Sequence, residues 1–145
     1  AVVSVKAVPL RPGTDFETER FRVKTAQVVH PTLAMAYRLE DKRTGGSVVI
    51  SGDTAYYAPL GRFAAGADVL IHEASAGPTS VDPLLAYGHS GALDAARIAL
   101  EAQPKRLCLV HCPAESRSDA VSAARGVFAE TYAPEEGETL DLPLQ

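Results

Sequence analysis

The first half of the chain alternates apolar and polar side chains with the two-residue period of β-strands. Three segments rich in β-branched and aromatic residues predict strands at residues 2–8, 21–29 and 35–40. A continuous Val-Val-Ile run predicts a further strand at residues 48–51. Polar stretches that contain glycine, at residues 11–17 and 41–47, are typical of turns and connect these strands.

The second half of the chain alternates short apolar runs with helical patterns. The apolar runs predict strands at residues 68–72 and 107–110, and the helical spacing predicts helices at residues 57–65, 92–103 and 116–131. Ser90 is the expected N-cap of the second helix, which must end before Pro104. Strands that are followed by alternating helices and strands predict an α/β fold with a mixed β-sheet flanked by helices.

Composition narrows the class of protein. A chain of 145 residues has the size of one domain, and its 46% hydrophobic and 22% charged residues are typical of a globular protein. The net charge is −4, and lysines and arginines form no cluster. Because nucleic-acid binding usually depends on clustered cations, this composition disfavours it.

The sequence also bears on location. No apolar run approaches the roughly 20 residues that span a bilayer, and no signal peptide is visible, so we expect no membrane association. Cys108 and Cys112 are too few and too close for a disulfide framework, and we expect reduced structural thiols in a cytoplasmic protein. The alternative interpretation is that these two thiols and His111 form a mononuclear metal site or a redox site.

An imidazole side chain, a carboxylate side chain, or both follow four of the apolar runs. The residues at these strand ends are His30, Asp53, the pair His72-Glu73, and His111, and the fourth histidine, His89, stands just before a predicted helix. Each one alone is typical of a structural residue, a turn carboxylate or a surface ion pair. Four such strand ends together favour a metal site, because imidazole and carboxylate are ligands that zinc prefers.

Five short motifs carry a resemblance to a known family. They are "HPTLAMAYRLE" from His30, "SGDT" around Asp53, "LIHEAS" around Glu73, "GHSG" around His89 and "LVHCP" around His111. In this order they resemble the C-terminal half of the metallo-β-lactamase superfamily, in its ribonuclease Z-like branch. Two positions depart from the family pattern, since Ala36 stands where a glycine is usual and Gly91 where a threonine is usual.

The resemblance implies a fold and a set of roles. Residues 1–145 would form the C-terminal half of an αββα sandwich. His30 and His111 would each bind one of two divalent ions, zinc first and manganese or iron as alternatives, and Asp53 would bridge them. A hydroxide held between the ions would attack a phosphodiester or ester, with His89 as the general acid and Glu73 orienting it. The resemblance assigns no role to His72.

The family's defining motif, His-x-His-x-Asp-His, is absent from the chain. We therefore expect one half of a larger hydrolase, inactive alone, whose partner is an N-terminal half that carries this motif. The start at Ala1 without an initiator methionine agrees with that expectation. Bare apolar sheet surface would make the isolated chain a homo-oligomer. The alternative function is a non-catalytic, metal-free binding or scaffold domain.

The sequence also constrains the substrate. Members of the family that process transfer RNA carry a long arm between the motifs of His30 and Asp53, and here only 22 residues separate the two. This short interval, the acidic composition and Gly91 argue against transfer RNA. They favour a small-molecule phosphodiester or ester substrate.

Overall fold

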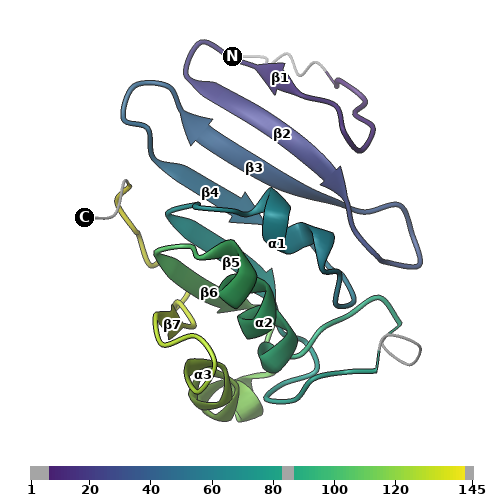
Figure 1. The fold of residues 1–145 in the computed structure, drawn as a ribbon, viewed down its shortest axis with the longest axis vertical. Coiled ribbons are helices and arrows are strands. Elements are labelled where there is room, and N and C mark those ends of the chain that lie inside the picture. The colour runs from purple at the N-terminus through teal and green to yellow at the C-terminus, as the bar shows by residue number, and fades with distance from the viewer. Residues whose placement is uncertain (1–6, 83–86, 143–145) are drawn as a thin grey trace, which may run out of the picture.

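A computed structural model of the chain describes residues 7–82 and 87–142. Within these residues, seven strands form one mixed sheet in which the strands follow each other in chain order (Figure 1). The strands are β1 (Phe16–Glu17), β2 (Phe21–Gln27), β3 (Met35–Asp41), β4 (Ser47–Ile50), β5 (Val69–Glu73), β6 (Arg106–Val110) and β7 (Thr131–Tyr132). The helices are α1 (Pro59–Phe63), α2 (Ala92–Ala102) and α3 (Arg117–Arg125), and a 3₁₀ turn, η1 (Ala114–Ser116), precedes α3. None of the described helices has the length and apolar character of a membrane span.

The sheet is antiparallel in its first part and parallel in its second. Strands β1 to β4 pair antiparallel through short turns, whereas β4, β5, β6 and β7 pair parallel and are connected by the helices. Parallel neighbours require such crossover connections, since a tight turn can only reverse the chain. Strands β2, β4, β5 and β6 therefore all run in one direction, and their carboxyl ends lie at the same edge of the sheet.

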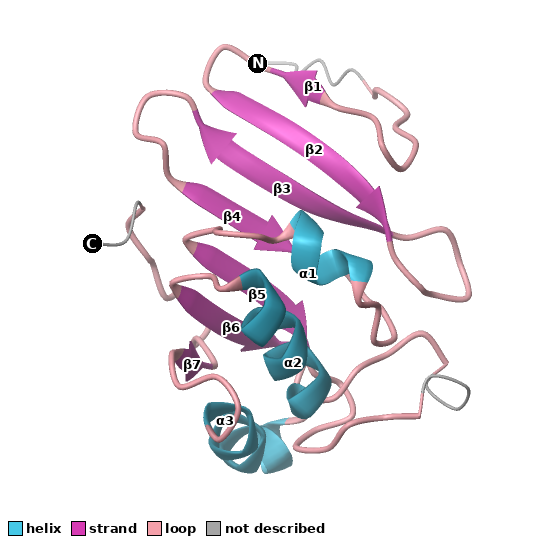
Figure 2. Cartoon of the chain, viewed as in Figure 1, coloured by secondary structure: helices cyan, strands magenta, loops and turns pink. Residues whose placement is uncertain are grey.

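The three helices lie on one face of the sheet and form the core with it (Figure 2). Leu70, Leu107 and Leu109 are fully buried in this layer, together with Ile98 of α2. Five buried alanines let α2 approach its neighbours closely: Ala92, Ala95, Ala96, Ala99 and Ala102. The small side chains thus place the beginning of α2 directly beside the strand ends.

The opposite face of the sheet carries no helix among the residues that the structure describes. Side chains alternate along each strand, so the neighbours of the buried leucines point to this second face. Five of its apolar side chains are half-buried or exposed, namely Leu39, Val48, Ile50, Ile71 and Val110, whereas Val23, Val69 and Cys108 on the same face are buried. The described residues thus leave part of the apolar surface of this open face accessible.

The mixed sheet flanked by helices is confirmed, and most element boundaries lie within two residues of prediction. The strand expected at residues 2–8 falls largely on residues 1–6, which lie outside the described residues, and residues 7–8 are not in a strand. Two short strands, β1 and β7, were not predicted, because two residues are too few to show a period.

The last helix was predicted too long. Instead of residues 116–131, α3 ends at Arg125, and the chain then turns so that the Thr131 hydroxyl donates a hydrogen bond to the Phe128 carbonyl (2.6 Å). Residues Thr131–Tyr132 pair with β6 instead of continuing the helix. Pairing with a strand distant in sequence therefore determines this boundary.

The prediction that Ser90 is the N-cap of α2 was wrong. The cap is Gly91, whose N–H donates to the Asp94 carboxylate at 3.1 Å. The Ser90 hydroxyl instead donates to the Thr54 carbonyl at 2.6 Å. A tertiary contact thus takes the serine that the local pattern assigned to capping.

Candidate metal centre

The polar residues that follow the strands converge at one edge of the sheet. His30 follows β2, Asp53 follows β4, Glu73 ends β5 and His111 follows β6. His89 reaches the same place from the segment that precedes α2. The parallel direction of the four strands explains the convergence, because their carboxyl ends must share an edge.

Glu73 and His89 form a directional pair. Glu73 Oε1 lies 3.0 Å from His89 Nδ1, and the Glu73 side chain is only 2% exposed. The same carboxylate accepts the Thr54 N–H at 3.0 Å, the Ser75 N–H at 3.0 Å and the Ser75 hydroxyl at 2.9 Å. A carboxylate can only accept, so Nδ1 of His89 carries the proton and Nε2 remains available. Glu73 itself has no free oxygen with which to bind a metal.

Asp53 and His111 form a second, more exposed pair. Asp53 Oδ1 lies 3.2 Å from His111 Nδ1, and the two side chains are 46% and 53% exposed. His111 has a φ of 52°, a left-handed conformation that costs a non-glycine residue on the order of 1 kcal/mol. Such strain is maintained where the surroundings determine it, often at functional sites. Here the left-handed turn directs the His111 imidazole towards Asp53.

His30 is held from two sides. Its Nδ1 lies 3.0 Å from the Thr32 hydroxyl, which leaves Nε2 as the outer nitrogen. Gly88, with a φ of +86°, packs against the ring so closely that an added Cβ would lie 2.7 Å from His30 Cδ2. The imidazole is therefore confined between its own turn and the segment that carries His89.

The distances allow metal coordination. Nitrogen or oxygen atoms of His30, Asp53 and His89 lie within 4.8 Å of one another, as do those of Glu73, His89 and His111. The His89 ring lies edge-on to both other imidazoles, with centroid distances of 5.5 Å to His30 and 5.6 Å to His111. Because Glu73 is saturated with hydrogen bonds, the second group is the weaker candidate. The donor set of imidazole nitrogens and carboxylate oxygens suits zinc.

His72 does not join this cluster. It lies on the helix-facing side of β5, 1% exposed, with Nδ1 2.8 Å from the Glu73 carbonyl. Its Nε2 has no hydrogen-bond partner in the part of the chain that the structure describes. Burial lowers the pKa of His72, so the ring is neutral near pH 7.

The two cysteines are free thiols outside both donor groups. Burial raises the pKa of the Cys108 thiol and that of Cys112. Burial and the neighbouring Cys108 raise the pKa of Tyr132 to about 12. Protonated thiols are poor metal ligands, so this chemistry does not favour the alternative cysteine–histidine site.

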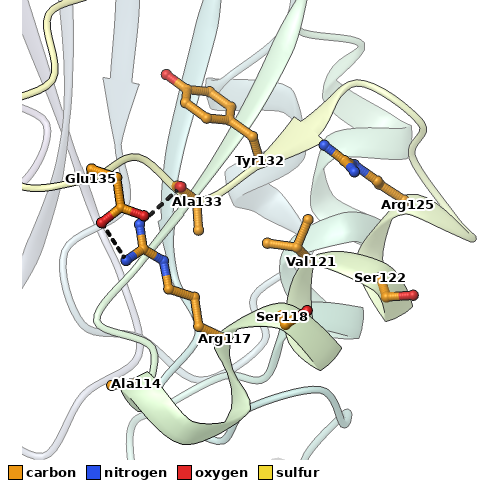
Figure 3. A pocket seen from close by; sticks show the side chains of 9 residues that line it. All are labelled: Ala114, Arg117, Ser118, Val121, Ser122, Arg125, Tyr132, Ala133 and Glu135. Atoms are coloured by element: carbon orange, nitrogen blue, oxygen red, sulfur yellow. Dashed lines mark hydrogen bonds and ion pairs between the residues drawn. The ribbon is translucent and has the colours of Figure 1, made fainter.

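A groove with a volume of about 590 Å³ lies elsewhere, along α3 (Figure 3). Its central cation, Arg117, is paired with Glu135 at 3.2 Å and donates to the carbonyl groups of Ala133 and Pro134. The guanidinium thus fastens the segment after β7 to α3. None of the five clustered residues lines this groove, and the charge of its Arg117 is balanced by Glu135.

Sequence patterns brought the five clustered residues to attention but missed the side chains that support them. Thr54, Gly88 and Ser90 each contact a segment that carries one of the five. All three stand next to Asp53 or His89 in the motifs, and this adjacency was the only available signal. Their contacts cross between loops, so no local pattern reveals them.

Comparison with known proteins agrees with this arrangement. A family model described as a beta-lactamase superfamily domain matches residues 2–112. The chain belongs to this superfamily. The metallo-β-lactamase fold protein YhfI from Bacillus subtilis superimposes with a TM-score of 0.77 at 26% identity, over 88% of this chain and 52% of that one. The expected family and fold are therefore confirmed.

Its relatives include ribonuclease Z. The ribonuclease Z of Natronomonas pharaonis is 33% identical over 130 residues, which are 87% of this chain and 41% of the relative. The short form of human tRNase Z shares the fold, with a TM-score of 0.64 at 24% identity over 89% of this chain and 46% of that one. The ribonuclease Z-like branch of the superfamily is thus confirmed. The chain spans about two fifths of the length of the curated relatives that it matches over most of its own length.

Proposed function

We propose that the chain carries one side of a metal-dependent hydrolase site, in which His30, Asp53 and His111 bind divalent ions. The observation that carries this proposal is the position of Asp53 between two imidazoles. Its carboxylate lies 3.2 Å from His111 Nδ1 and within 4.8 Å of a His30 nitrogen. One carboxylate with two oxygens can serve a cation on each side.

We propose an acid–base role for the pair of Glu73 and His89. Glu73 accepts the Nδ1–H of His89, so Nε2 can first take up a proton, which gives an imidazolium paired with Glu73, and then deliver that proton to a leaving oxygen. The ring stands between those of His30 and His111, so it faces the same space as the metal ligands. Two divalent ions, zinc first and manganese or iron as alternatives, supply Lewis-acid activation of water and of the ester when bound.

Three ligands are too few for two ions. We propose that an N-terminal half with the His-x-His-x-Asp-His motif supplies the others and that it covers the open sheet face. The share of the ribonuclease Z relatives that the chain spans supports this division. Without that half, the open face with Ile50 and Ile71 is expected to make the chain associate with itself and leave it inactive.

The proposed substrate class is a phosphodiester or a related ester. We expected from the sequence that transfer RNA is not the substrate. The names of the ribonuclease Z relatives count against this expectation. Gly91 no longer supports that expectation either, because an added Cβ would lie 1.9 Å from the Thr79 carbonyl oxygen. Local packing thus requires glycine there. The interval between His30 and Asp53 does hold only β3, a turn and β4, which still favours a small substrate.

Zinc titration of the chain tests the metal ligands. We expect wild-type chain to bind zinc and Asp53→Asn to bind it at least about tenfold more weakly. Asp119→Asn, which changes an exposed carboxylate on α3, is the matched control and should bind as the wild type does. Equal affinity of the Asp53 variant and the wild type would contradict the proposed ligand.

Hydrolysis is tested with the chain joined to an N-terminal half that carries the missing motif. We expect cleavage of bis(p-nitrophenyl) phosphate, and His89→Ala should reduce it by about 10²–10⁴-fold. Precursor transfer RNA in the same assay compares the two substrate classes. A protein that neither binds metal nor cleaves either substrate would instead favour the metal-free binding or scaffold domain.

A further inference from the structure

Thr54 contacts three segments of the candidate site, although it contributes no ligand. It stands next to Asp53 and is fully buried. Its backbone N–H donates to Glu73 Oε1 at 3.0 Å, the same oxygen that faces His89 Nδ1. The residue after the proposed bridging carboxylate is thus bonded directly to the proposed acid–base pair.

The Thr54 hydroxyl fixes the segment that carries His30. It accepts a hydrogen bond from the Val29 N–H at 3.1 Å and donates its own proton to the Ala55 carbonyl at 2.7 Å. The Ala55 N–H in turn donates to the Val29 carbonyl at 2.8 Å. Val29, which precedes His30, is therefore tied by both of its backbone groups to the segment that follows Asp53.

The Thr54 carbonyl fixes the segment that carries His89. It accepts the Ser90 hydroxyl at 2.6 Å, and Ser90 is also fully buried. This bond accounts for Ser90 better than helix capping does, since Gly91 caps α2. One threonine thus joins three segments that lie 19 to 36 residues away from it along the chain.

We infer that Thr54 is the positioning residue of this site: its hydroxyl and carbonyl set the spacing of His30 and His89 around Asp53. This inference rests on the proposed function, because it gives these side chains a shared task. The buried Thr54 hydroxyl bonds two backbone groups and can therefore hold the segment that carries His30 in one position. Supporting bonds of this kind typically change metal affinity by about 10–100-fold when they are removed.

The inference is tested first without metal. In the wild-type chain, ring protons of His30 and His89 should show nuclear Overhauser effects, because the rings lie edge-on with centroids 5.5 Å apart. Thr54→Val keeps the shape of the side chain but removes the hydroxyl, and it should abolish or strongly weaken these effects. Thr54→Ser keeps the hydroxyl and should retain them.

Thr131→Val provides the matched control for a lost buried hydroxyl. Thr131 is 2% exposed, its hydroxyl donates to the Phe128 carbonyl, and it lies in β7, away from the site. This variant should retain the ring effects even if it unfolds more easily. Ring effects that persist in Thr54→Val, or that disappear equally in Thr131→Val, would overturn the inference.

A second variant keeps the test valid if Thr54→Val fails to fold. Ser90→Ala leaves the Thr54 hydroxyl in place and removes only the bond to its carbonyl. We expect it to shift the imidazole resonances of His89 more than those of His30, whose segment is still held by the Thr54 hydroxyl. Unchanged His89 resonances would remove this half of the inference.

Zinc affinity then separates the inference from the proposed function. We expect Thr54→Val to weaken zinc binding about tenfold, and Thr54→Ser to stay within about threefold of the wild type. If the wild-type chain binds no zinc while its ring effects still depend on Thr54, the positioning role stands and the metal ligands are wrong. If zinc binds but Thr54→Val changes neither property, the positioning role is wrong and the metal ligands stand.

Discussion

Gly88 lies against the imidazole of His30 so closely that no side chain fits between them. A Cβ at this position would be 2.3 Å from Pro31 Cδ and 2.7 Å from His30 Cδ2. The glycine thus brings the backbone before His89 into contact with the ring that we propose as a ligand. Glycine in a left-handed conformation permits this approach at little cost.

Replacement of this glycine separates the close contact from the backbone conformation. We expect Gly88→Ala to displace the His30 ring and to lower zinc affinity by about tenfold. Gly13→Ala is the matched control, because its φ of +81° resembles the +86° of Gly88 but nothing lies within 4 Å of its Cβ. Gly13→Ala should lose about 1 kcal/mol of unfolding free energy from its left-handed conformation alone. Gly88→Ala should lose more than that, because its Cβ also clashes with Pro31 and His30, and only this variant should lose zinc affinity. Equal zinc binding by the two would show that the contact with His30 is unimportant.

Glu73→Gln is expected to destabilise the protein although it is nearly isosteric. The carboxylate accepts hydrogen bonds at both oxygens, and an amide must turn its NH₂ group towards one set of N–H donors. One unsatisfied buried group costs about 1–3 kcal/mol, which urea unfolding would detect. Glu135→Gln, in an exposed pair with Arg117, should change the unfolding free energy by less than about 0.5 kcal/mol. Equal effects of the two changes would contradict the role of Glu73 as an anchor.

His72 should make stability depend on pH. Burial lowers its pKa in the folded protein, so below about pH 6.5 the unfolded chain binds a proton that the folded chain resists. The free energy of unfolding is therefore not reduced by His72 above about pH 6.5, and it decreases as the pH falls below this value. The contribution is at most about 1.4 kcal/mol per pH unit.

Urea unfolding at pH 7.5, 6.5 and 5.5 would measure this effect. His72→Asn keeps a donor for the Glu73 carbonyl but cannot titrate, so it should flatten the dependence relative to the wild type. All other titrating groups are shared by the two proteins. Identical pH profiles would mean that His72 does not stay neutral in the folded chain.

Cys112→Ser should leave zinc affinity unchanged within about twofold. Burial raises the pKa of the Cys112 thiol, and this residue belongs to neither donor group despite its position next to His111. Zinc titration of the variant beside His111→Ala, which should bind weakly, makes the comparison. A loss of affinity in the cysteine variant would restore the alternative site with Cys108, Cys112 and His111.

The sequence by itself determined the fold class and the residues that gather at the candidate site. Strand periodicity and short apolar runs predicted six strands, five of which are present among the described residues. The apolar runs that end in His30, Asp53, Glu73 and His111 marked the edge of the sheet. Such patterns are local, because a period of two or a polar residue after an apolar run can be recognised without knowing the neighbouring strands.

Tertiary structure alone decided how these residues are held. The sequence did not reveal that Ser90 bonds to Thr54, that Gly88 confines His30, that β7 replaces the end of a helix, or that packing against the Thr79 carbonyl requires Gly91. Each of these contacts joins segments that are distant along the chain. Their geometry depends on which strands are neighbours and in which direction they run, and a sequence pattern determines neither.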